Sequence, residues 1–158
     1  MSVIESVEVE FKSAMKSVIA SEGVAKEDAK FRLNTIRSIK AAITAEETSG
    51  KSRSVLSDAD VESVLRRQIK SLESSVEIYT EAGESAKAEV FRPESEIVRE
   101  FVTEQLGEDE TRAIVLQIIA EKGLAGSGGR GIGQVMKELK GNSSIDAGLA
   151  SKIAKESL

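Results

Sequence analysis

Two groups of basic residues have the types and spacing that could act on a charged partner. The first group falls within an arc of roughly 80° on a predicted helix and comprises Lys26, Lys30, Arg37 and Lys40. The second group lies on the next predicted helix and comprises Arg66, Arg67 and Lys70. Clustered Lys and Arg side chains favour a phosphate backbone, because each contact releases condensed counterions. The alternative interpretation is a solvated helix face that has no partner.

A glycine-rich stretch from Gly123 to Gly133 is the second feature with possible chemistry. It contains the spacing G-x-G-x-x-G, but a dinucleotide site needs a preceding strand and an acidic residue about 20 positions later. The preceding segment predicts a helix, and no Gly-Lys-Ser/Thr follows as a phosphate-binding loop requires. We therefore favour a flexible connection between two helices, although Arg130 and the amides of a helix start could hold an anion.

The sequence contains neither Cys nor His. It therefore has no thiol nucleophile, disulfide, thiolate or imidazole metal site, and it lacks the usual general base near neutral pH.

Ser127 and the pair Ser143-Ser144 suggest Ser-Ser-Lys amidase chemistry. However, no Lys stands in a recognisable motif, and the segment before Asp146 is typical of a helix N-cap. Carboxylates at predicted helix ends suit the macrodipole and include Glu46, Glu47, Asp58 and Asp60. We predict no catalytic residue, metal site or cofactor.

Composition indicates an all-α protein of one domain or two small ones. The 158 residues are 40% hydrophobic and 31% charged, with one Pro and only 3% aromatic residues. The net charge of −5 argues against a dedicated nucleic-acid binder, but residues 108–158 hold seven basic and seven acidic side chains. No apolar run approaches the ~18 residues of a membrane span, and the first residues resemble no targeting signal. We therefore expect a soluble cytoplasmic protein.

Helix signals divide residues 1–106 into four helical patterns. Ser2 and Glu5 have capping-box spacing before a first helix that ends by Gly23. A second runs from near Lys26 to about Thr48, with Ala25, Ala29, Ile36, Ile39 and Ile43 predicted to face inward. A third follows the cap at Ser57 and stops at Gly83. The fourth pattern, residues 84–103, contains Pro93, and we expect the helix to break there and a new one to begin.

Residues 107–158 predict a compact three-helix bundle. The segment 108–122 has β-branched residues, but its flanks are helix formers and Gly123 follows as a cap, so we predict a helix. Two short helices complete the chain, and their predicted core comprises Ile132, Val135, Met136, Leu139, Leu149 and Ile153. The expected architecture is an N-terminal helical subdomain over 1–106 and a C-terminal three-helix bundle over 107–158.

Short motifs in a shared order resemble those of the YqeY-like family over nearly the whole chain. They include Ala14-Met15-Lys16, the stretch from Arg32 to Ile43, and Glu104-Gln105-Leu106 before an acidic helix start. Gly133 to Lys137, followed by Lys140-Gly141, resembles the C-terminal tail of the B subunit of the tRNA-dependent amidotransferase. In that multidomain relative the tail handles tRNA and does no chemistry.

This resemblance implies a non-catalytic helical module that binds tRNA or a tRNA-handling, amidotransferase-like complex. The family carries a label of carbon–nitrogen ligase with glutamine as amido-N-donor, but this chain has no residues for that reaction. We expect RNA contacts from Arg37, Lys40, Arg66, Lys70, Arg130, Lys137 and Lys140. Neither DNA nor a membrane is an expected partner. The alternative is a protein–protein adaptor that binds no RNA, and the least favoured interpretation is a hydrolase that uses Ser or carboxylates.

Overall fold

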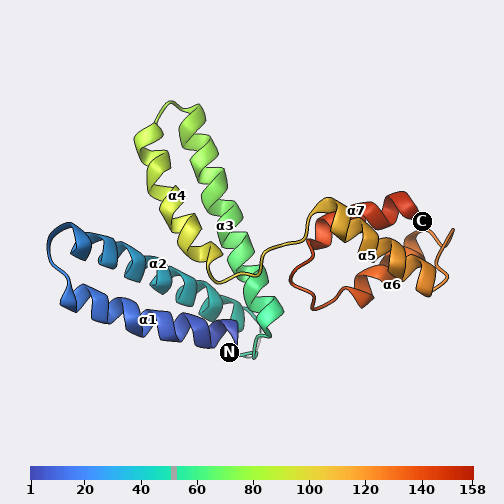
Figure 1. The fold of residues 1–158 in the computed structure, drawn as a ribbon, viewed down its shortest axis with the longest axis horizontal. Helices are drawn as coiled ribbons and strands as arrows, with labels where there is room; N and C mark the ends of the chain where they lie inside the picture. The colour runs from blue at the N-terminus through green and yellow to red at the C-terminus, as the bar shows by residue number, and fades with distance from the viewer. Residues whose placement is uncertain (51–52) are drawn as a thin grey trace. The chain divides into compact units, whose positions relative to one another are not determined.

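The computed structural model describes residues 1–50 and 53–158 as a wholly helical fold, which confirms the predicted class. The helices, in chain order, are α1 (Val3–Ala20), α2 (Gly23–Glu47), α3 (Asp58–Glu81), α4 (Ser85–Arg99), α5 (Glu108–Glu121), α6 (Gly129–Glu138) and α7 (Ala147–Ser157). The chain divides into an N-terminal unit, Met1–Val102, and a C-terminal unit, Thr103–Leu158 (Figure 1). No described helix is both long and apolar enough to cross a membrane.

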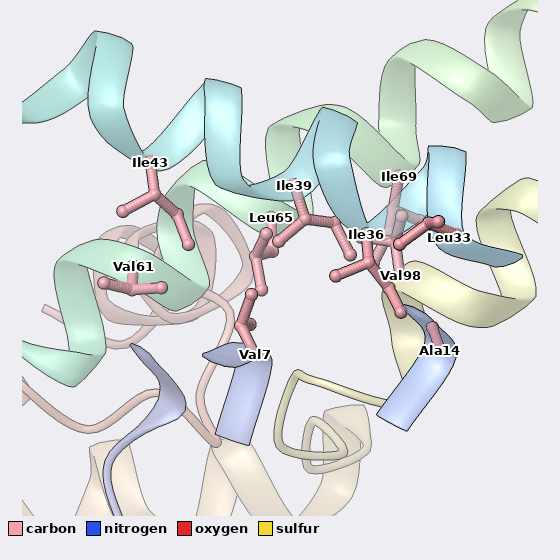
Figure 2. Packing of buried hydrophobic residues seen from close by; sticks show 10 residues of the cluster. All are labelled: Val7, Ala14, Leu33, Ile36, Ile39, Ile43, Val61, Leu65, Ile69 and Val98. Carbon is pink, nitrogen blue, oxygen red and sulfur yellow. The ribbon is translucent and has the colours of Figure 1, made fainter. Parts of the chain in front are cut away.

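The N-terminal unit consists of two helical hairpins, α1–α2 and α3–α4 (Figure 1). All four helices contribute to one aliphatic core, which is shown in Figure 2. Its most deeply buried members are Val7, Ile36, Ile39, Leu65 and Val98. Each such side chain stabilises the fold by roughly 1.5–3 kcal/mol relative to an exposed one. The core therefore depends on side chains from both hairpins and fixes one against the other.

A capping box starts the first helix of each hairpin. The sequence predicts the box at Ser2 and Glu5, and at Ser57 it predicts a cap. Glu5 N–H donates to Ser2 Oγ at 3.2 Å, and Ser2 N–H donates to Glu5 Oε2 at 2.7 Å. Ser57 and Asp60 repeat this exchange at the start of α3. In addition, Val3 N–H donates to Asp58 Oδ1 at 3.0 Å, so the start of α3 also caps the start of α1.

The predicted helix break at Pro93 is wrong, because α4 runs through it from Ser85 to Arg99. Pro93 is exposed, while Ala88 before it and Val98 after it are buried. Packing on both sides of the proline holds the helix continuous and offsets its missing hydrogen bond. A second correction concerns α2, which begins at Gly23 and leaves Ala25 exposed rather than facing the core.

Arg32 of α2 joins three helices of the N-terminal unit. Its Nε donates to Glu10 Oε1 of α1 at 2.8 Å. Its two terminal nitrogens donate to both carboxylate oxygens of Glu100, the C-cap residue of α4, at 3.0 and 2.6 Å. These hydrogen bonds lower the pKa of Glu100 below its usual value. Only the planar five-donor guanidinium can hold both carboxylates in this way.

We predict that Arg32→Gln lowers the free energy of unfolding by about 1 kcal/mol, since the three side chains are partly exposed. Because the pKa of Glu100 is lower in the folded state, its contribution is present above the unfolded value of about 4.3 and is lost as pH falls through the folded value. Urea unfolding followed by circular dichroism from about pH 6 to about pH 3 should therefore give a shallower pH dependence in the variant than in the wild type.

The matched control is Arg92→Gln, which removes an exposed pair between neighbouring turns of one helix, Arg92 to Glu89 at 2.9 Å. Its unfolding free energy should stay within about 0.5 kcal/mol of the wild type. Equal losses in the two variants would contradict a special role for Arg32.

In the C-terminal unit, α5, α6 and α7 pack against one another. The predicted core is confirmed, because Val135, Leu139 and Ile153 are buried and three further residues pack against them: Ile132, Met136 and Leu149. Residues 114–119 are helical, as predicted. Leu106 N–H donates to the carbonyl oxygen of Ser144 at 2.7 Å, which ties the start of the unit to the turn before α7.

Candidate nucleic-acid interface

Lys40, a predicted RNA contact, is engaged inside the N-terminal unit. Its Nζ lies 2.7 Å from Glu8 Oε1 of α1 and 4.2 Å from the ring centroid of Phe11. The ammonium therefore holds α2 to α1 through an ion pair and a cation–π contact. Binding a phosphate here would compete with both interactions, so the structure gives Lys40 a role in helix packing that the sequence prediction did not include.

Arg66, a second predicted contact, pairs with a buried carboxylate. Its NH2 donates to Glu62 Oε2 at 3.0 Å, and Glu62 is only 5% exposed. A carboxylate removed from water needs a partner, and removing that partner leaves an uncompensated charge. Arg66 is thus committed to neutralising Glu62.

Arg37 and Lys70 are exposed, on α2 and α3 respectively. Arg37 donates to Asn34 Oδ1 at 3.2 Å, and Lys70 forms no ion pair within the described part of the chain. Gln68 Nε2 donates to Ser38 Oγ at 3.0 Å, which links the two helices close to both cations. Two of the four predicted contacts in the N-terminal unit therefore present their charge to solvent, and the other two hold carboxylates.

The three predicted contacts in the C-terminal unit are arranged differently. Arg130 and Lys137 stand seven residues apart on α6 and so point within about 20° of each other around its axis. Around the helix axis they lie roughly 100–160° from Gly131 and Val135, the buried residues of α6. Lys140 follows one residue beyond the C-cap of α6. All three are exposed, and none forms an ion pair among the residues that the structure describes.

Two further lysines, Lys152 and Lys155 on α7, are also exposed and form no ion pair among the described residues. The sequence prediction did not include them. They lie on the side of α7 opposite its buried residues Ala150 and Ile153. A count of charges over residues 123–158 gives five basic and three acidic side chains and could have found them. We call the set the C-terminal cations: Arg130, Lys137, Lys140, Lys152 and Lys155.

The three acidic side chains of residues 123–158 are all engaged elsewhere. Glu138 lies 3.2 Å from Lys122, and Glu156 lies 3.5 Å from Arg112, so two of them pair with basic residues on or next to α5. Asp146 caps α7 by accepting from Leu149 N–H at 2.6 Å. The remaining acidic residues of this unit lie before or on α5. The unit therefore has an acidic side at α5, and its unpaired positive charge lies on α6 and α7.

The glycine-rich segment connects two helices, α5 and α6, and runs into the start of α6. The helix α5 precedes it where a dinucleotide site needs a strand. Gly126 and Gly128 have positive φ angles of +73° and +57°, a conformation that other residues rarely adopt. Gly128 is the N-cap of α6 and brings no side chain to the helix start.

Two of the serines considered for catalysis take part in local hydrogen bonds. Ser144 N–H donates to Asn142 Oδ1 at 3.1 Å, and Ser127 Oγ donates to the carbonyl of Leu124. Asp146 is the N-cap of α7, which confirms that residues 142–146 lead into a helix. Across residues 1–50 and 53–158, no group of three or more acidic side chains is placed to hold a metal ion.

Comparison with known families decides the relationship that the short motifs suggest. The family described as Yqey-like protein matches residues 5–158, which is nearly the whole chain. This protein belongs to the YqeY-like family. The match includes residues of both units of the fold, so the family is defined by the two units together. A search of curated proteins finds no match.

A close approach at Gly131 holds the start of α6 against the end of the chain in this YqeY-like protein. A Cβ atom at this position would overlap the Ser127 hydroxyl and lie 2.9 Å from Leu158 Cδ1. At Gly133, two residues further along the same helix, a Cβ would meet nothing within 4 Å. The two glycines therefore form a matched pair, since both are helical and only one is enclosed.

We predict that Gly131→Ala destabilises the C-terminal unit by about 1–3 kcal/mol relative to Gly133→Ala, because Ser127 and Leu158 must move. Gly133→Ala should leave stability unchanged or raise it by up to about 1 kcal/mol, as alanine favours a helix. Thermal and urea unfolding of both variants measures the difference. Equal stability would show that the close approach at Gly131 is easily relieved.

Proposed function

We propose that this chain is a non-catalytic RNA-binding module, whose RNA is tRNA, free or within a tRNA-handling complex. We further propose that the C-terminal cations supply its phosphate contacts. The observation that carries the proposal is the electrostatic division of the C-terminal unit. Five exposed basic side chains stand without ion-pair partners among the described residues on α6, α7 and the turn between them, while every acidic side chain of residues 123–158 is engaged.

The chemistry of the set suits a phosphate backbone better than it suits bases. Four of the five cations are lysines, which act as point charges and impose little geometry. The two aromatic residues of the α3–α4 hairpin, Tyr79 and Phe91, stack on each other with centroids 5.6 Å apart and are half-buried, so they offer no open stacking platform. The proposed binding is therefore dominated by charge and shape.

The resemblance to the amidotransferase tail is what favours tRNA as the class of RNA. The residues that resemble the amidotransferase tail, Gly133 to Lys137 and Lys140-Gly141, fall on α6 and directly after it, where three of the C-terminal cations lie. Within the C-terminal unit, the acidic residues on and before α5 would repel a phosphate backbone, which favours an approach from α6 and α7.

Arg37 and Lys70 remain proposed as secondary contacts, since both are exposed and α2 and α3 meet beside them. Lys40 and Arg66, which also belong to the predicted set, would have to exchange Glu8 and Glu62 for phosphate. We therefore rank their contribution below that of the C-terminal cations.

Fluorescence anisotropy of labelled bulk tRNA, titrated with the protein at low and moderate salt, tests this function. We expect saturable binding that weakens steeply with salt. In Arg130→Gln/Lys137→Gln/Lys140→Gln, the slope of log affinity against log salt should fall by about 0.7–0.9 for each phosphate that the variant no longer neutralises. Absence of binding at high micromolar protein and low salt would reject direct recognition.

The matched control is Lys30→Gln/Lys87→Gln/Arg92→Gln, which removes the same amount of charge from cations that are already paired between neighbouring helical turns. If both triple variants lose affinity equally, overall charge rather than the C-terminal cations governs binding, and the proposed surface is wrong.

A protein–protein adaptor is the second candidate function, and exposed apolar side chains favour it. Ile78 on α3 and Val90 on α4 are 63% and 54% exposed. Association through such residues depends weakly on salt, whereas phosphate binding depends on it steeply. A salt-insensitive complex would therefore support the adaptor.

A further inference from the structure

Gly133 is a glycine that the fold of this chain does not require. It lies inside α6 and its φ angle is not positive, so its backbone conformation is one that any residue adopts. A Cβ atom added there would meet nothing within 4 Å, whereas at Gly131 it would overlap the Ser127 hydroxyl. Neither the backbone conformation nor packing within the chain therefore explains a glycine at this position.

Gly133 also costs stability. In a helix interior, glycine is less favourable than alanine by about 1 kcal/mol, because it loses more backbone freedom on folding and leaves the backbone exposed to water. The helix α6 has ten residues and already contains Gly129 and Gly131. A glycine that weakens so short a helix, and that no neighbouring side chain needs, is explained most directly by something that approaches the helix from outside.

Gly133 lies between two of the C-terminal cations along α6. Arg130 stands about 4.5 Å before it along the helix axis, and Lys137 stands about 6 Å after it. Around the axis, Gly133 is about 60° from Arg130 and about 40° from Lys137. It is exposed and lies about 160° from the buried Val135. The side of α6 that carries these two cations therefore has a stretch of bare helix between them.

The missing side chain changes how closely a ligand can approach. A side chain on a helix leans towards the helix N-terminus and covers the turn before its own Cα. At Gly133 this cover is absent, and the backbone of that turn is open to direct contact, which is one of the recurring uses of glycine. A strand that lies against the helix here has Arg130 on one side and Lys137 on the other, so both cations can reach its phosphates.

We propose that Gly133 is a positioning residue of the RNA site, at which the sugar–phosphate backbone of the bound RNA packs directly against the surface of α6. This role depends on the proposed function, because the C-terminal cations supply the attraction and the absent side chain leaves room for the strand. Lysines are flexible point charges that hold a phosphate at a range of distances from the helix. The bare helix adds a contact of fixed geometry, since its backbone does not move as a long side chain does.

The residues around Gly133 favour a phosphate-bearing strand over an apolar protein segment. Arg130 and Lys137 are exposed cations that form no ion pair among the described residues. The nearest apolar residues of α6, Ile132 and Met136, pack against the core of the C-terminal unit instead. A protein helix seated on the glycine would set its own apolar residues against these charges, whereas a nucleic-acid backbone would neutralise them.

Fluorescence anisotropy of labelled bulk tRNA with the variants Gly133→Ala and Gly133→Leu tests this role. Affinity should fall by about threefold or more for alanine and at least about tenfold for leucine, because each side chain lifts the strand from the helix. The slope of log affinity against log salt should change little, since the long cationic side chains still reach the same phosphates. Both substitutions favour a helix, so circular dichroism should show no fall in the unfolding temperature.

The control Ala113→Leu also places a leucine on an exposed helical position of the C-terminal unit, but on α5, and should bind tRNA like the wild type. Wild-type affinity in Gly133→Leu overturns the role of Gly133 and leaves the proposed function intact. Equal loss in the two leucine variants also overturns it, because an added apolar side chain then weakens binding wherever it lies. Absence of binding by the wild type rejects the proposed function, and the role of Gly133 with it.

Discussion

Each carboxylate that pairs with a lysine or arginine removes that cation from the set that can meet a partner. This constraint shapes the whole chain, which has 27 acidic and 22 basic residues. In the N-terminal unit, Glu8 engages Lys40, Glu62 engages Arg66, and Glu10 with Glu100 engages Arg32. The same pairs that join the helices thereby reduce the charge available for recognition. In residues 123–158 the exposed cations outnumber the acidic side chains, and this is why the proposed function rests there.

Local signals in the sequence predicted much of the fold. These signals include the capping box at Ser2 and Glu5, the cap at Ser57, the helix formers around segment 114–119 and the apolar spacing around Val135, each of which involves residues a few positions apart. The predicted helix break at Pro93 was wrong, because the burial of Ala88 and Val98 outweighs the loss of a single hydrogen bond. That outcome depends on packing against α3, which local sequence does not encode.

The candidate site was harder to predict, for the same physical reason. Spacing on a helix shows which side chains share a face, but it does not show which of them are already paired. The Glu62–Arg66 pair is four residues apart and could have been anticipated from the sequence. The pair between Glu8 and Lys40 joins two helices and needs the fold. Lys152 and Lys155 were missed because no short motif contains them, although the charge balance over residues 123–158 does reveal them.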